Sequence, residues 1–226
     1  MSSGLVTAAY VVAAILFILA LGGLSNQEKA KRAIWYGIVG MALAVLATVG
    51  TSGLDGYTLL VAMIVIGGIG GAYVANKVQM TQMPELVAGF HSLVGLAAVF
   101  IGFNADIEMN RAIAALETGT VDQLAGFAAT VAKKSTVEMG ILKVELFLGI
   151  LIGAITFTGS IVAYGKLAGK ISSAALTLPF RHQINLAAIL LCALLGYLYV
   201  DGAGVWTMVL VAIIAGGIGW HLIMAI

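Results

Sequence analysis

The chain has 226 residues, of which 62% are hydrophobic and only 9% are charged, and its mean hydropathy is +1.10. A soluble domain of this length does not need so much apolar sequence, so the composition indicates a membrane protein that crosses the bilayer several times. The formal net charge of +1 gives no reason to expect a nucleic-acid partner. The single cysteine, Cys192, excludes a disulfide framework within the chain.

Seven apolar segments are long enough to cross a membrane as helices. Their approximate ranges are 4–24, 33–50, 58–76, 84–103, 141–165, 185–200 and 205–226. Segments of this length satisfy their backbone in lipid only as helices, whereas a β-barrel needs alternating segments of about ten residues. We therefore expect one all-α integral membrane domain over residues 1–226, a bundle of about seven helices, with residues 104–140 as a long outer loop.

The lysines and arginines of the connecting loops predict the orientation of the bundle. The first and fifth loops are basic, whereas the second and sixth contain no lysine or arginine. The basic residues are Lys29, Lys31, Arg32, Lys166, Lys170 and Arg181. Because basic loops stay in the cytoplasm, we expect the N-terminus outside and the C-terminus cytoplasmic. The loop 104–140 is also basic, but charge in a long loop has less influence on topology.

The fourth span contains an ionisable side chain within an apolar helix. Pro84 suits the first helical position, and Glu85 follows in the first turn, where the helix dipole favours an anion. His91 lies about 10 Å further along the helix. Ionisable groups at such a depth are costly and mark functional sites by default, so His91 is the first candidate for proton chemistry. The alternative is a neutral histidine that forms a structural hydrogen bond between helices.

Two stripes of small and polar residues accompany His91. On the fourth span the residues that share its face are Ala88, Gly95, Ala98 and Gly102, and on the fifth span the stripe is Glu145, Gly149, Gly153, Thr156 and Ser160. Ser160 lies at nearly the same depth as His91. One interpretation is that the two stripes face each other and hold water. The other is that the hydroxyl groups bond to carbonyls of their own helix.

The remaining histidines lie near the expected cytoplasmic ends of spans. Arg181 and His182 precede the sixth span, and the simplest interpretation of His182 is a basic anchor at the membrane interface. His221 follows Trp220 in the last span, a pair typical of the aromatic belt. The glycine-rich run 215–219 is expected to pack helices, because no strand precedes it to form a nucleotide loop. No group of His, Cys, Asp or Glu has the spacing of metal ligands.

Five separated sequence motifs are together typical of one protein family. They are SGLVTAAY (3–10), MTQMPELV with HS (80–92), TFTGS (156–160), GKLAGKI (165–171) and LPFRH (178–182). Together they resemble the membrane domain of the beta subunit of the proton-translocating nicotinamide nucleotide transhydrogenases, and the resemblance covers nearly the whole chain.

The resemblance implies part of an enzyme that transfers hydride from NADH to NADP⁺ while a proton moves inward across the membrane. It implies that His91 is the principal residue of the proton pathway and that Ser160 lies near that pathway. It also implies that Arg181 and His182 face soluble domains. From their positions we add Glu85 and Thr156 as further pathway candidates.

Beta subunits of this family continue with two more spans and an NADP(H)-binding domain, which lie beyond Ile226. We therefore expect this chain to bind no cofactor and to transfer no hydride by itself, with NAD(H) and NADP(H) held elsewhere in the complete complex. The expected partners are the alpha subunit, the NADP(H) domain, a second copy of the complex and the lipid of a bacterial inner (plasma) membrane.

Two other functions remain open at the level of sequence. One is a channel or secondary transporter subunit without nucleotide chemistry, in which the His91 face is the permeation path. The other is a structural membrane anchor, in which His91 only connects two helices.

Overall fold

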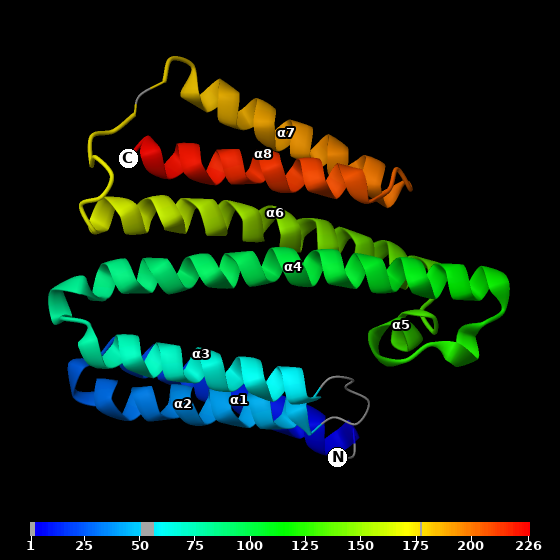
Figure 1. Cartoon of the computed structure of the whole chain (residues 1–226), viewed down its shortest axis with the longest axis horizontal. Coiled ribbons are helices and arrows are strands. Elements are labelled where there is room, and N and C mark those ends of the chain that lie inside the picture. Colours follow the sequence, from blue (N-terminus) through cyan, green and yellow to red (C-terminus); the bar gives the residue numbers. More distant parts are fainter. Residues whose placement is uncertain (1–2, 51–56, 177) are drawn as a thin grey trace. The chain divides into compact units, whose positions relative to one another are not determined.

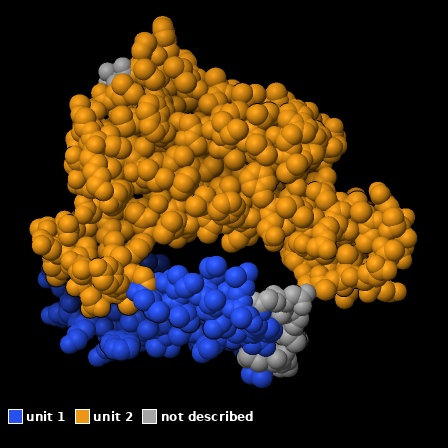
Figure 2. Space-filling model, in the orientation of Figure 1, with its two compact units in different colours: residues 1–69 blue, residues 70–226 orange. Residues whose placement is uncertain are grey.

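The computed structural model describes residues 3–50, 57–176 and 178–226. These residues form seven helices that are long and apolar enough to cross a membrane, and they contain no strand. The expected all-α bundle is confirmed for this part of the chain. The chain divides into two compact units, Met1–Ile69 and Gly70–Ile226, which Figure 2 distinguishes by colour and which we describe separately.

The first unit is built on a helical hairpin. Helices α1 (Ser3–Leu24) and α2 (Gln27–Val49) lie side by side (Figure 1), and small residues such as Ala13 and Gly40 form the contact between them. α2 begins before residue 33, where the apolar pattern starts, because the Asn26 side chain accepts a hydrogen bond from the Glu28 N–H and caps the helix. Helix α3 (Tyr57–Lys77) begins in this unit and ends in the second.

The second unit contains four long helices and three short ones. The long helices are α4 (Met83–Thr118), α6 (Thr136–Leu167), α7 (Arg181–Val200) and α8 (Val205–Met224). The short ones are η1 (Met80–Gln82), η2 (Val121–Gln123) and α5 (Gly126–Val131). Along the layer the order is α4, α6, α8 and α7 (Figure 1). α6 runs antiparallel to α4 and parallel to α8, so one end of the unit, here named the Arg181 end, holds the starts of α4 and α7 and the last turns of α6 and α8.

α4 is longer than the apolar pattern predicts. It continues through 36 residues to Thr118 and stops where Gly119 adopts a left-handed conformation (φ 72°). Residues 104–118, which were expected in a loop, are therefore helical, and α6 begins at Thr136 because Ser135 and Glu138 form a capping box. The C-terminal part of α4 packs on α5, with Met109, Ala112, Ala128 and Val131 buried between them. This part of α4 lacks the continuous apolar sequence of a lipid-facing helix, and its packing on α5 stabilises the helix instead.

Glycine allows α4 and α6 to approach to backbone contact. A Cβ atom at Gly95 would lie 2.6 Å from the Phe157 nitrogen and 2.7 Å from the Gly153 oxygen, and a Cβ at Gly153 would lie 2.8 Å from the Gly95 oxygen. These distances are shorter than any side chain tolerates. The small face of the fourth span, which the sequence associates with His91, is therefore mainly the packing surface for α6.

α6 uses its opposite side for a second close contact. A Cβ at Gly159 would lie 3.3 Å from the Gly219 oxygen of α8, and the Thr158 hydroxyl donates to the Gly216 oxygen at 2.7 Å. The glycine-rich run 215–219 packs helices, as predicted. α6 is consequently the central helix of the second unit.

Replacement of Gly95 by alanine is expected to destabilise the bundle, because the added methyl group overlaps backbone atoms of α6 that have little room to move. We expect the free energy of unfolding in detergent to fall by about 1–3 kcal/mol. Gly149→Ala is the matched control, since a Cβ there meets nothing within 4 Å and alanine favours the helix. Equal stabilities of the two variants in thermal unfolding would contradict close packing at Gly95.

Candidate functional site

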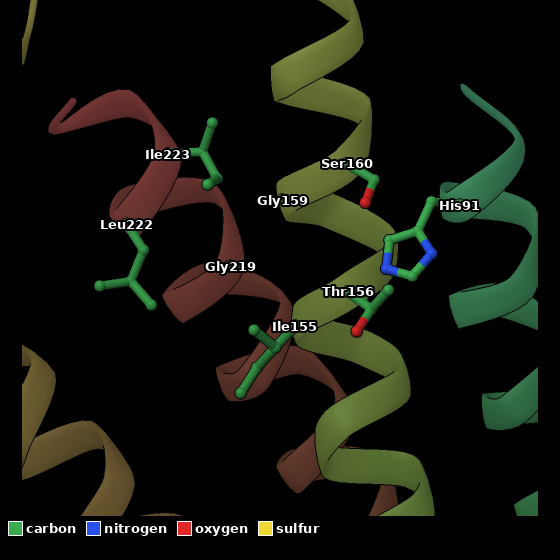
Figure 3. Close-up of a pocket in the computed structure, with 8 residues that line it drawn as sticks. All are labelled: His91, Ile155, Thr156, Gly159, Ser160, Gly219, Leu222 and Ile223. Atoms are coloured by element: carbon green, nitrogen blue, oxygen red, sulfur yellow. The ribbon is translucent and has the colours of Figure 1, made fainter. Parts of the chain in front are cut away.

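A groove of about 200 Å³ lies near the Arg181 end of the second unit, between α4, α6 and α8. Its lining combines one imidazole and two hydroxyl groups with apolar and small residues. The lining residues are His91, Ile155, Thr156, Gly159, Ser160, Gly219, Leu222 and Ile223 (Figure 3). One water occupies about 30 Å³ in the liquid, so the groove has room for several waters.

His91 projects from the margin of the α4–α6 contact. It lies one turn before Gly95, and its ring extends toward Thr156 and Ser160 of α6 (Figure 3). The residue is exposed in this chain, and within the described residues its ring forms no hydrogen bond to protein. The imidazole is therefore available to water in the groove, which is what a group that gains and loses a proton requires. A structural hydrogen bond to another helix, the alternative considered for His91, is not formed within the described part of the chain.

Thr156 and Ser160 line the groove from α6, on the side that faces His91 (Figure 3). Ser160 is only 9% exposed and Thr156 is half-buried. The nearby Thr158 behaves differently, because its hydroxyl donates to the Ala154 oxygen of its own helix and to Gly216 of α8. The bonding of a hydroxyl to a carbonyl of its own helix, the second interpretation, is thus seen at Thr158, whereas water in the groove stays a prediction.

Two carboxylates that the sequence associates with the site lie outside the groove. Glu85 occupies the first turn of α4 and is half-buried, but it does not contribute to the lining. Glu145 is exposed on α6, eleven residues from Thr156, or about 16 Å along the helix. In the described chain, the groove therefore contains no carboxylate beside His91.

Arg181 and His182 form the first turn of α7, at the Arg181 end of the unit. The Arg181 Nε–H donates to His182 Nε2 at 3.4 Å, and His182 is exposed. Neither residue contributes to the groove. They occupy the surface at this end of the helices rather than the site of His91.

The interpretation of His221 as an interfacial partner of Trp220 is wrong. Trp220 is exposed, but His221 is only 6% exposed and faces α7, where its Nδ1 lies 2.8 Å from the Asn185 Oδ1. The two neighbours point to different sides because successive helical residues are about 100° apart. Only the position of α7 decides that one side is buried.

A buried carboxylate lies at the other end of the unit, and the sequence did not predict its burial. Asp106 of α4 is 2% exposed and accepts hydrogen bonds from the Tyr199 hydroxyl of α7 (2.5 Å) and from Asn110 Nδ2 (3.1 Å). Lys143 of α6 lies over the Tyr199 ring, 6.0 Å from its centroid, and donates to the Val200 oxygen. The spacing of Asp106, Met109 and Ala112 on one helical face could have indicated burial. Residues 104–140 were expected in a loop, however, and that hid the pattern.

The helices and the groove define a class of protein, namely a multi-pass membrane protein with an ionisable histidine and two hydroxyl groups in a small groove between helices. Comparison with known families makes the assignment specific. Residues 6–226 match the family described as NAD(P) transhydrogenase beta subunit, and the chain belongs to this family.

Individual relatives agree with this assignment. The chain is 42% identical, over 182 residues, to the protein named NAD(P) transhydrogenase subunit beta of Rhodospirillum rubrum, and the protein of the same name from strain ATCC 11170 of that organism matches equally well. The match covers 80% of this chain and 35% of the relative. The chain thus spans about a third of the length of the curated relatives it matches.

Loss of the Tyr199 hydroxyl is expected to destabilise the protein, because it removes one of the two donors to the buried Asp106 carboxylate. For Tyr199→Phe we expect the free energy of unfolding to decrease by about 1–3 kcal/mol. Tyr197→Phe is the control on the same helix, since Tyr197 is 67% exposed, and we expect a change within about 0.5 kcal/mol. Indistinguishable unfolding curves for the two variants would argue against an energetic role of the Asp106 contact.

Proposed function

We propose that this chain is the proton-translocating membrane part of a transhydrogenase, which couples inward proton movement to hydride transfer from NADH to NADP⁺. The observation that supports the proposal is the His91 groove. It places a titratable ring, free of protein hydrogen bonds among the described residues, beside two hydroxyl groups and within a membrane helix. Membership of the transhydrogenase beta-subunit family supplies the reaction.

His91 is proposed to take up a proton from one side of the membrane and release it on the other. Histidine is the side chain that changes charge near neutral pH, so modest changes in its surroundings shift it between the two states. Ser160 and Thr156 each carry a hydroxyl that both donates and accepts, so with water in the groove they can pass a proton to or from the ring. Glu85, in the first turn of the same helix, is proposed to act at the mouth of the pathway rather than as a direct partner of His91.

The nucleotides are proposed to bind outside this chain. The described residues contain no strand, and the glycine run of α8 is used to pack against α6, so nothing among them forms the glycine-rich βα turn that holds a dinucleotide. NADP(H) and NAD(H) supply the hydride chemistry in the complete complex. The residues of this chain carry the proton and couple the protonation state of His91 to the soluble domain that binds the nucleotide.

The energy available for coupling is sufficient for this role. Moving one charge through 100 mV is worth about 2.3 kcal/mol. Since about 1.4 kcal/mol corresponds to a factor of ten, the same charge shifts an equilibrium by roughly 50-fold. If the protonation state of His91 and the affinity of the soluble domain for its nucleotide are coupled, the coupling is reciprocal.

The surroundings of the chain are also proposals. The basic loops support an orientation in which the Arg181 end of the second unit faces the cytoplasm, with the N-terminus outside and the C-terminus inside. Arg181 and His182 would then face the NADP(H) domain. The proposed partners are that domain, the alpha subunit and a second copy of the complex, in a bacterial inner membrane.

Replacement of His91 by alanine is the decisive test. In the complete complex, reconstituted in sealed vesicles and driven by NADPH with an NAD⁺ analogue, we expect proton translocation and coupled turnover to fall by roughly 100-fold, as when a positioned acid–base group is lost. A pH-sensitive dye follows the proton, and absorbance follows the nucleotide. Leu93→Ala is the control, because Leu93 is an exposed α4 residue that does not line the groove.

The same experiment distinguishes the alternatives. Unimpaired pumping by His91→Ala would remove His91 from the mechanism. Solute flux through the wild-type protein without any nucleotide would favour a channel or transporter. Full activity of His91→Asn, which retains polarity but does not titrate, would favour a purely structural role.

A further inference from the structure

His221 is a buried titratable group near the His91 groove that the proposed proton pathway does not use. It lies on α8, 6% exposed, and its Nδ1–H donates to the Asn185 side-chain oxygen of α7 at 2.8 Å. Its Nε2 is buried and has no hydrogen-bond partner within the described structure. Among the described residues, this hydrogen bond links the side chains of α7 and α8 at the Arg181 end of the unit.

The turn of α8 that carries His221 also forms part of the His91 groove. Gly219, Leu222 and Ile223 line the groove on one side of α8, while His221 faces α7 on the other. Gly219 packs so closely on Ile155 and Thr158 of α6 that a side chain at this position would not fit. The turn of α8 that lines the groove is therefore the same turn that contacts Asn185 through His221.

Asn185 lies one helical turn from the residues expected to meet a soluble domain. It is four positions after Arg181 and three after His182, on the first turns of α7. No side chain caps this end of α7, and Phe180 precedes it in a left-handed conformation (φ 61°), which is unfavourable for a residue other than glycine. The start of α7 thus depends on contacts with its neighbours rather than on its own cap.

We propose that His221 is a positioning residue, which transmits changes in the His91 groove to the first turn of α7 through its hydrogen bond to Asn185. The inference rests on the proposed function, because such transmission has a purpose only if His91 carries the proton. Separation of α7 from α8 would leave a buried ring and a half-buried amide without partners, so the two helices move together at this point. The link uses Nδ1–H, which the cation also carries, and so it requires no titration of His221 itself.

The neighbouring charges do not substitute for this link. On α6, the Lys166 ammonium donates to the Met224 and Ile226 oxygens at the end of α8. On α7, Arg181 is engaged with His182. Both cations lie at the Arg181 end, and within the described residues neither forms a hydrogen bond with His221.

The test uses the complete complex in sealed vesicles with His221→Leu, Asn185→Leu, the double variant and His221→Asn. The measured quantity is the factor by which an imposed proton gradient accelerates NADPH formation. In each single leucine variant and in the double variant, we expect this factor to fall at least about fivefold, which is the lower end of the usual range of allosteric coupling. The rate without a gradient is expected to change little. His221→Asn retains an N–H at the position of Nδ1 and is expected to keep the stimulation.

The double variant separates transmission from stability. A single leucine leaves one polar group unpaired and lowers the melting temperature, whereas two leucines remove both polar groups and restore it. If His221 acts only structurally, stimulation recovers together with the melting temperature in the double variant, and the inference is wrong. Normal stimulation in either single leucine variant, or its loss in His221→Asn, would also overturn it.

Controls keep this inference separate from the proposed function. Absence of proton pumping by the wild-type complex, or equal pumping by the wild-type complex and the His91→Ala variant, contradicts the proposed function itself. A wild-type complex that depends on His91, together with undiminished stimulation in the His221 and Asn185 variants, contradicts only the role of His221.

Discussion

The backbone contact between α4 and α6 is the constraint on which the rest of the second unit depends. Gly95 and Gly153 meet with no room for a side chain, and the two helices are held in one register and at one rotation. In lipid there is little hydrophobic force between helices, so such close van der Waals contact carries the association. Because His91 lies one turn from Gly95, this contact also determines that its ring projects at the margin of the interface.

The contacts of α6 with both α4 and α8 form the His91 groove. α6 packs on α4 through Gly153 and on α8 through Gly159, and the groove that Thr156 and Ser160 line lies between the three helices. The groove is a consequence of two tight contacts on either side of one helix. The polar groups of the groove come from α4 and α6, while α8 contributes small and apolar residues. The same turn of α8 contacts α7 through His221 and Asn185.

Two ionisable groups of α4, Asp106 and His91, lie in opposite environments. Asp106 is buried, and two donors satisfy it, so its environment stabilises one arrangement of α4, α6 and α7. His91, fifteen residues or about 22 Å earlier on the same helix, faces a groove and has no protein partner among the described residues. A satisfied polar group adds rigidity, whereas an unsatisfied one beside space for water can change its protonation state. The contrast is the physical reason to associate proton chemistry with His91 rather than with Asp106.

The sequence alone determined the all-α membrane class, the number of long helices, and the similar depth of His91 and Ser160. Apolar length and a fixed rise per residue suffice for these features. Tertiary structure decided the remainder. The helical course of residues 104–118 depends on packing against α5, and the burial of Asp106 and His221 depends on partners that are 93 and 36 residues away. A helical pattern shows which residues share a face, but only the neighbouring helix determines whether that face is packed, wet or exposed.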